Sequence, residues 1–148
     1  MPLPVSDICF LISFLLSYNK LCFIGGDIVG YYIEEVDLIN LHIEIMKFIN
    51  DFKALHRKET EDLFTGGYCY WFAFILKERF KYANPHIMCN DVKGHFACMI
   101  RSDIYDITGI IPASDKSDYE YWEEYKLIEK EAAERITRDC ILKIPVKD

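Results

Sequence analysis

The segment from residue 69 to residue 76 reads Cys-Tyr-Trp-Phe-Ala-Phe-Ile-Leu, and it constrains the fold more than any other part of the chain. It begins two residues after the pair Gly66 and Gly67. Glycine permits a sharp backbone turn, so a new element is expected to start near Cys69. A helix over this segment is apolar on every side. We therefore expect a central helix sandwiched between other elements rather than half exposed.

The stretch after this helix predicts a small antiparallel sheet. Ala83-Asn84-Pro85 ends the helix, and residues 87–90 form a short strand. Residues 95–100 and 104–107 have the composition of two strands, joined by the tight turn Arg101-Ser102-Asp103 and ended by Thr108-Gly109.

Helices are predicted on both sides of this region. From Val36 onward apolar residues recur every three or four positions, which is the pattern of one helix with a single apolar stripe. A charge-rich helical part runs from Ser117 to Ile128 and on to Cys140. Its expected inward positions are Trp122, Tyr125, Ala133, Ile136 and Cys140. The fold class is thus α+β, with a central Cys-bearing helix packed on a small antiparallel sheet and helical N- and C-terminal parts.

The first 35 residues read as an apolar N-terminal extension to a domain over residues 36–148. Residues 6–18 suit a buried helix, and residues 21–24 and 28–33 suit a hairpin around Gly25-Gly26-Asp27. Residues 8–24 are the most apolar stretch, but Asn19 and Lys20 interrupt it, so it falls short of the roughly 20 apolar residues of a spanning helix. Membrane contact through residues 8–24 is the less favoured alternative.

Composition narrows the function classes. A chain of 148 residues with 51% apolar side chains is long enough for one sizeable core. Lys and Arg number 17 against 24 Asp and Glu, and the net charge of -7 argues against nucleic acid as a partner. The six cysteines lie far apart in apolar surroundings, so we interpret them as reduced thiols of a cytoplasmic protein.

Three residues on the predicted elements suit nucleophilic catalysis. Cys69 lies at a helix N-terminus, where unpaired backbone N–H groups and the helix dipole favour a thiolate. The hairpin brings His95 and Asp106 onto neighbouring strands, so that the carboxylate can hold one imidazole nitrogen while the other faces the thiol. The sequence predicts Cys69 as nucleophile, His95 as base and Asp106 as the group that orients it.

The residues around these positions resemble a known superfamily. The segments are Gly67-Tyr68-Cys69-Tyr70-Trp71-Phe72-Ala73, His95-Phe96 and Tyr105-Asp106-Ile107-Thr108-Gly109. They look like the core of papain-like and transglutaminase-like cysteine enzymes, and Asp-x-Thr is similar to the transglutaminase-like version. The resemblance implies a Cys-His-Asp catalytic triad. The span from about Met46 to Lys143 also resembles small proteins of bacterial and phage genomes.

The chain departs from that pattern in two respects. Cys69 and His95 are 26 positions apart, and His95 and Asp106 are 11 apart, which is compact for these families. The chain contains no Gln, the residue that completes the oxyanion hole in papain-like enzymes. The second oxyanion donor is then a backbone N–H or a side chain among the candidate substrate-binding residues Tyr68, Tyr70, Trp71 and Asn90, and the sequence leaves this choice open.

These observations favour a small cysteine hydrolase or acyl-transferase that acts on an amide bond of a protein or peptide substrate and needs no cofactor. The alternative is a catalytically inert phage or bacterial accessory module that binds a protein partner. A zinc site is a weaker interpretation of His86, Cys89, His95 and Cys98, because side chains three positions apart on one strand point to opposite faces. We therefore expect no metal.

Overall fold

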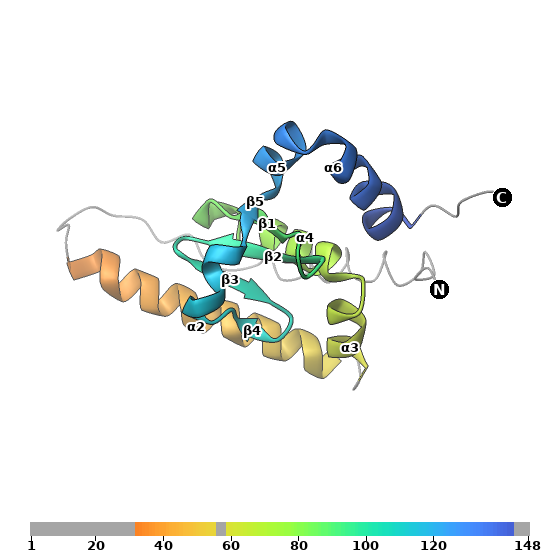
Figure 1. Cartoon of the computed structure of the whole chain (residues 1–148). Helices are drawn as coiled ribbons and strands as arrows, with labels where there is room; N and C mark the ends of the chain where they lie inside the picture. Colours follow the sequence, from red (N-terminus) through yellow and green to blue (C-terminus); the bar gives the residue numbers. More distant parts are fainter. Residues whose placement is uncertain (1–31, 56–58, 144–148) are drawn as a thin grey trace. The chain divides into compact units, whose positions relative to one another are not determined.

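The structure, a computed structural model, describes residues 32–55 and 59–143 (Figure 1). The chain divides into two compact units, with the boundary between Asp51 and Phe52. The second unit carries all the residues that the sequence singles out for chemistry. Within the described residues, no helix is long and apolar enough to cross a membrane. The predicted N-terminal helix, most of the predicted hairpin and the apolar stretch 8–24 lie outside the described residues.

The second unit is built on a five-stranded antiparallel sheet with the strand order β4-β3-β2-β1-β5. Its strands are β1 (His86–Asn90), β2 (His95–Ile100), β3 (Asp103–Asp106), β4 (Gly109–Ile110) and β5 (Glu120–Tyr121). The first three match the strands expected from the sequence, and the tight turn at Arg101 and Ser102 joins β2 to β3. The sequence analysis did not predict β4 and β5, which have only two residues each and therefore carry no alternating pattern.

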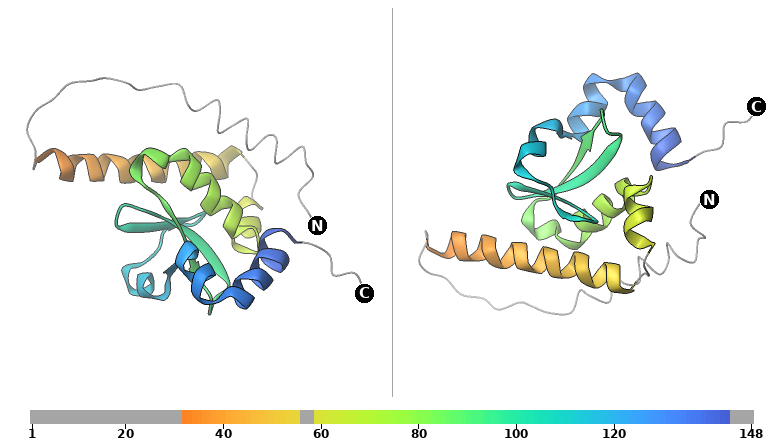
Figure 2. Two further views of the ribbon diagram at one scale, coloured as in Figure 1. Left: turned by 90° about the horizontal axis from the view of Figure 1, so that it is seen from above. Right: turned by 60° about the horizontal axis from the view of Figure 1, so that its bottom comes forward.

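Successive side chains of a strand point to opposite faces of the sheet. Because consecutive residues of β1, β2 and β3 are buried, both faces are covered. On one face, Met88, Ala97, Ile104 and Ile111 form a buried cluster. On the other face lies α4 (Cys69–Arg79), which packs mainly against β2. Figure 2 shows this helix extending along the sheet, with the C-terminal helices beyond the β1–β5 edge.

The central helix α4 is covered less completely than expected. Phe72, Ala73 and Leu76 are buried, but Trp71 and Phe74 are each 36% exposed. The expectation of a helix enclosed on every side was therefore wrong for this edge of α4. Its aromatic side chains pack on one another instead, with the rings of Trp71 and Phe74 at 6.0 Å.

The remaining helices are α2 (Tyr32–Leu55), α3 (Thr60–Thr65), α5 (Trp122–Ile128) and α6 (Lys130–Ile136). Helix α2 confirms the helix predicted from Val36, and it starts four residues earlier, so that Tyr32 and Ile33 are helical rather than part of a hairpin. Of its predicted stripe, Ile45, Phe48 and Phe52 are buried, whereas Leu38 and Leu55 at the two ends are exposed.

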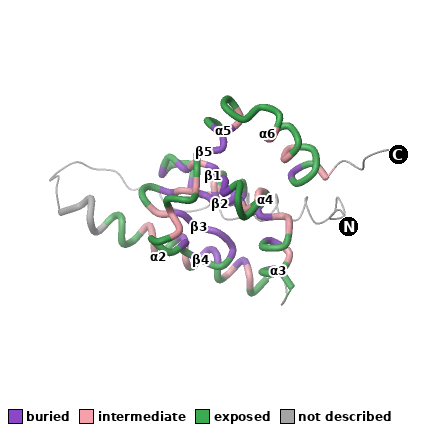
Figure 3. The backbone as a smooth tube through the Cα atoms, in the orientation of Figure 1, coloured by how far each residue is buried: buried purple, intermediate pink, exposed green. Residues whose placement is uncertain are grey.

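The C-terminal part differs most from the expectation. Residues 117–121 were predicted to be part of an α-helix, but Ser117 and Asp118 end the 3-10 helix η2 (Ala113–Asp118), Tyr119 is irregular, and residues 120–121 form β5. Trp122, Tyr125 and Ala133 are buried as predicted. Helix α6 continues into the π-helical turn η3 (Thr137–Ile141), which shifts the register, so that Ile141 is buried and Cys140 is exposed. Figure 3 shows the buried positions gathered on β1, β2, β3 and α4, with α5 and α6 largely exposed.

Phe72 should be one of the most costly side chains to remove. It is 1% exposed, and its ring lies 5.2 Å from that of Phe52 and 5.5 Å from that of Phe64. Phe72→Ala should lower the free energy of unfolding by about 3–5 kcal/mol, because it leaves a cavity among these rings. Phe74→Ala on the same helix is the matched control and should cost about 1 kcal/mol or less. Equal losses in chemical denaturation would contradict this packing.

Candidate functional site

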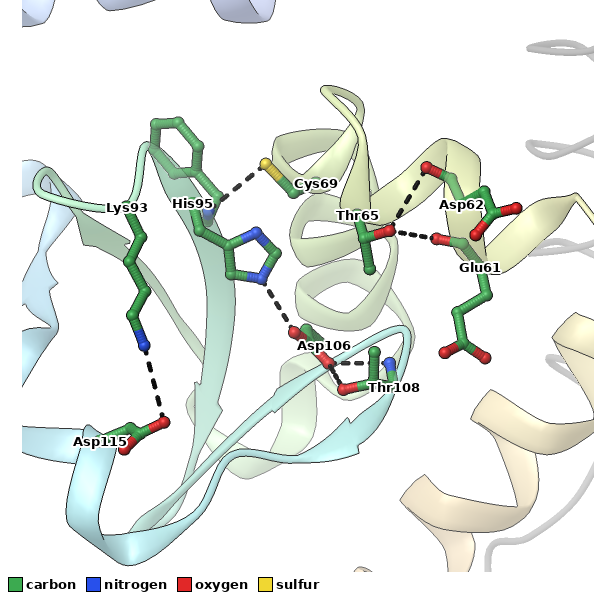
Figure 4. A network of polar contacts seen from close by, with 10 residues as sticks. Glu61, Asp62, Thr65, Cys69, Lys93, His95, Asp106, Thr108 and Asp115 are labelled. Carbon is green, nitrogen blue, oxygen red and sulfur yellow. Dashed lines mark hydrogen bonds and ion pairs between the residues drawn. The ribbon is translucent and has the colours of Figure 1, made fainter.

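Cys69 is the first residue of α4, and the backbone turn before it determines where its thiol lies. Gly67 has a φ of 128°, a conformation that side chains other than hydrogen rarely permit, so the glycine is required for this entry into the helix. Cys69 is 7% exposed. Its Sγ accepts a hydrogen bond from the backbone N–H of Phe96 on β2, with an N···S distance of 3.4 Å (Figure 4). This contact holds the thiol beside the first residues of β2.

His95 and Asp106 lie side by side, as the hairpin predicted. His95 is the first residue of β2 and Asp106 is the last residue of β3. The His95 Nε2 and the Asp106 Oδ2 are 2.8 Å apart. Figure 4 shows the ring of His95 between the Asp106 carboxylate and the Cys69 thiol. The structure thus brings together the three residues that the sequence analysis selected.

Thr108 holds the second oxygen of the Asp106 carboxylate. Its backbone N–H donates to Oδ1 at 2.8 Å, and its hydroxyl donates to the same oxygen at 2.5 Å. The other oxygen is left for His95. The Asp-x-Thr pattern therefore has a structural explanation. With both oxygens hydrogen-bonded, the carboxylate cannot rotate away from the imidazole without losing a bond. Thr108 was noticed in the sequence only as part of a motif, and its role comes from the structure.

The three ionisable groups shift one another's pKa values toward a charged pair. Burial raises the pKa of the Cys69 thiol, but hydrogen bonds from His95 and from the Phe96 backbone outweigh burial, so that the pKa is lowered overall. Burial lowers the pKa of His95, whereas its hydrogen bonds to Asp106 and Cys69 raise that pKa to about 9. The pKa of Asp106 is lowered, since hydrogen bonds from His95 and Thr108 outweigh its burial. Each shift stabilises the charged form of its group, so the arrangement favours a thiolate beside an imidazolium over the neutral pair.

The thiol and the imidazole open into a small cavity of about 130 Å³. Cys69, Tyr70, Asn90 and His95 belong to its wall, and Gly67 and Gly94 add positions without side chains. The opposite side comes from the C-terminal segment. Its lining residues there, hereafter the roof, are Ile136, Asp139, Cys140 and Lys143.

The four candidate substrate-binding residues separate into two pairs. Tyr70 and Asn90 line the cavity. Trp71 donates its indole N–H to the carbonyl of Ile141 at 3.1 Å, and the Tyr68 ring lies 4.6 Å below the Lys143 ammonium. Trp71 and Tyr68 therefore hold the C-terminal segment, which is a structural role that the sequence did not suggest.

The sequence analysis missed the roof. Cys140 was expected to face inward but is exposed, and Asp139 and Lys143 had no assigned role. One sequence signal could have pointed to the roof residues: the apolar Ile141 among charged neighbours indicates that this segment packs against the rest of the protein. That signal is weak because a π-helical turn breaks the 3.6-residue period on which such an assignment depends.

The alternative zinc set is not assembled. Across residues 32–55 and 59–143, no three His, Cys, Asp or Glu side chains converge in the way a metal ion requires. Cys89 and Cys98 are buried thiols whose pKa values burial raises, to about 11 and about 12 respectively. Such thiols stay protonated at neutral pH, whereas the pKa of the Cys69 thiol is shifted in the opposite direction.

The fold and the site define a small α+β protein with a Cys-His-Asp cluster beside a cavity. A family model described as Phage YunG-like protein matches residues 45–139, and the chain belongs to this family. The match includes Cys69, His95 and Asp106, and it confirms the similarity to phage proteins. Comparisons with curated proteins and with solved structures find no match.

The assignment to the papain-like or transglutaminase-like superfamily was therefore wrong. The family that matches is the phage YunG-like one, and the papain-like core expected from that assignment is not confirmed. The error has a physical origin: a nucleophile at a helix N-terminus with a base and an acid on adjacent strands recurs on unrelated folds. A few motif residues cannot tell common descent from a common geometric solution.

Cys69 should be the first thiol to be alkylated as the pH is raised. Its lowered pKa keeps a thiolate at a pH where ordinary thiols are protonated. At about pH 6, iodoacetamide followed by peptide mapping should label Cys69 before the exposed Cys140, despite the greater accessibility of Cys140. Preferential labelling of Cys140 under these conditions would contradict the ion pair.

The imidazole of His95 should titrate far above its usual range. NMR titration should give a pKa of about 9 in the parent protein, with the imidazolium present below that pH. Asp106→Asn should lower this pKa toward 6.5, because it removes the carboxylate that stabilises the charged ring. Asp103→Asn, on the same strand but paired with Lys116, is the matched control and should leave the His95 titration unchanged. An Asp106→Asn variant with the parent's titration curve would show that another group sets the His95 pKa.

Proposed function

We propose that this protein is a thiol hydrolase or acyl-transferase that cleaves an amide bond through Cys69, His95 and Asp106. The observation that carries the proposal is the position of His95, which is bonded to the Asp106 carboxylate that Thr108 holds and lies between that carboxylate and the Cys69 thiol at the wall of a cavity (Figure 4). A buried cysteine with only a packing role has no need of an imidazole whose other nitrogen is held at 2.8 Å by a carboxylate. A nucleophile with a base and an orienting acid needs this geometry.

The first half of the reaction forms an acyl-enzyme. The Cys69 thiolate attacks the carbonyl carbon, and the π electrons of the C=O bond move to the oxygen. When that electron pair returns, the carbon–nitrogen bond breaks, and His95 donates its proton to the departing amine. The products are a thioester on Cys69 and a free amine, so that charge and protons balance.

The second half releases the acyl group. Neutral His95 takes a proton from water, or from an acceptor amine, as this nucleophile attacks the thioester. The carbon–sulfur bond then breaks and restores the Cys69 thiolate beside the His95 imidazolium. Water gives hydrolysis, and an amine gives acyl transfer. Neither route requires a metal or an organic cofactor.

The dimensions of the cavity support a small acyl group. Its volume of about 130 Å³ is well below the roughly 300–1,000 Å³ of pockets that enclose drug-sized ligands. Gly67 and Gly94 contribute no side-chain volume to its lining, and the roof completes that lining. A protein or peptide substrate would therefore place one small residue or side-chain amide in the cavity, with the rest of the chain outside.

Acylation by p-nitrophenyl acetate tests this proposal because the acetyl group fits the cavity and the leaving group is coloured. The parent should release p-nitrophenol in a burst equal to the enzyme concentration and carry an acetyl group on Cys69, identified by peptide mass. Cys69→Ala and His95→Ala should each abolish the burst, and the double variant should be no worse than either single one. Asp106→Asn should slow the burst by orders of magnitude, because the imidazole loses its orientation.

Cys140→Ser is the matched control, since Cys140 is the exposed thiol at the same cavity and should contribute nothing to the burst. The proposal fails if Cys69→Ala acylates at the parent's rate. It also fails if all variants behave alike while binding of a protein partner is lost, a result that would identify an inert accessory module. Thermal unfolding of each variant separates loss of function from loss of fold.

A further inference from the structure

We infer that the side-chain amide of Asn90 donates a hydrogen bond to the carbonyl oxygen of the substrate as Cys69 attacks it. The juxtaposition behind this inference is that Asn90 lines the cavity together with Cys69 and His95 and carries a buried side-chain N–H group with no hydrogen-bond partner among the described residues. The inference rests on the proposed function and identifies the oxyanion donor that the sequence left open.

Strand register places Asn90 beside the reacting groups. Asn90 is the last residue of β1 and His95 is the first residue of β2, and the two are directly opposite in the antiparallel ladder. Residues opposite each other project to the same face with Cβ atoms about 4.5–5.5 Å apart. Residue 96, the next on β2, donates its backbone N–H to the Cys69 sulfur. The amide, the imidazole and the thiol therefore meet at one end of the sheet.

A hydrogen bond within the turn fixes which way the Asn90 amide points. The backbone N–H of Lys93 donates to the Asn90 Oδ1 at 3.0 Å. Because this oxygen is engaged, the amide cannot flip without losing that bond, and the Nδ2 group keeps its position. The donor is preorganised, which is what stabilisation of a developing charge requires.

The Nδ2 of Asn90 has no hydrogen-bond partner among the described residues, although it is buried. The whole residue is only 1% exposed. A buried donor without an acceptor costs about 1–3 kcal/mol, so proteins rarely keep one without a reason. A substrate oxygen that enters the cavity would satisfy this donor.

The other candidates are less well placed for this role. The Trp71 N–H already donates to the Ile141 carbonyl, and Tyr68 does not line the cavity. Tyr70 does line it, and its ring packs edge-on against Phe96 with centroids 5.2 Å apart. Tyr70→Phe keeps that packing and removes only the hydroxyl, so it is the control that tests Asn90 against the remaining candidate.

The negative charge on the substrate oxygen develops in a tetrahedral intermediate. An aldehyde is therefore a suitable probe, because it forms a stable tetrahedral adduct with the thiol. Acetaldehyde adds to Cys69 when the carbon–sulfur bond forms, the C=O π pair moves to oxygen and the His95 proton neutralises that oxygen. The product is a hemithioacetal with its oxygen where the oxyanion would lie. Iodoacetamide is the reference reagent, because it alkylates the same thiolate by displacing iodide and creates no oxyanion.

The experiment compares aldehyde affinity with alkylation rate in the parent, Asn90→Leu, Asn90→Asp and Tyr70→Phe. Leu removes both polar atoms of the amide, whereas Asp keeps the acceptor for Lys93, replaces the donor with an oxygen and adds a negative charge. Both Asn90 variants should bind acetaldehyde about 10- to 100-fold more weakly than the parent. Their alkylation rates, compared at equal thiolate fraction from full pH profiles, should stay within about threefold. Tyr70→Phe, which removes the competing hydroxyl, should weaken acetaldehyde binding less than either Asn90 variant does.

The outcomes separate this inference from the proposed function. If the parent neither binds acetaldehyde nor alkylates Cys69 at acidic pH, the proposed function is wrong. If the parent does both, and Asn90→Leu and Asn90→Asp bind acetaldehyde within about twofold of the parent, Asn90 is not the donor. A second measurement needs no variant: in the parent, the Asn90 side-chain amide proton signal should move downfield when the hemithioacetal forms. A signal that stays in place would also overturn the inference.

Discussion

The hydrogen bond from the Phe96 backbone N–H to the Cys69 sulfur joins the two elements on which the second unit depends. It ties the first residue of α4 to the second residue of β2, and it satisfies the Phe96 backbone N–H group, which is buried there. The same bond sets the distance between the thiol and the neighbouring His95. Packing and chemistry are therefore linked, because a shift of α4 along the sheet would separate the thiol from its imidazole and leave the Phe96 N–H unpaired.

The central elements could be predicted because their signals are local. The Gly66-Gly67 turn, the apolar segment of α4 and the turn at residues 101–102 each determine structure within a few residues. The register of β2 against β3 then follows from one tight turn, and it brings Asp106 to His95 without any knowledge of the rest of the fold. The C-terminal region was less predictable, since a two-residue strand and a π-helical turn leave no period in the sequence.

The candidate site shows the same division. Its three ionisable residues could be chosen from residue type and order. The oxyanion donor proposed above could not, because Asn90 and Trp71 looked equivalent in the sequence. What distinguishes them is long-range: the indole N–H meets a carbonyl 70 residues away, whereas the amide meets no acceptor in the described part of the chain. The mistaken superfamily assignment has a related cause. A favourable arrangement of three side chains carries no information about ancestry.

The cavity is lined by two parts of the chain, of which only the first lies wholly inside the span that the family model matches. The floor, which holds Cys69, Asn90 and His95, lies on α4 and the β1–β2 hairpin, inside the span that the family shares. Much of the roof is at the edge of that span, and Cys140 and Lys143 lie beyond its end at residue 139. Substitutions in the roof change the shape and charge of the entrance without touching a reacting atom. The roof therefore contains positions at which a substitution alters what enters the cavity while the contacts among His95, Asp106 and Thr108 stay as they are.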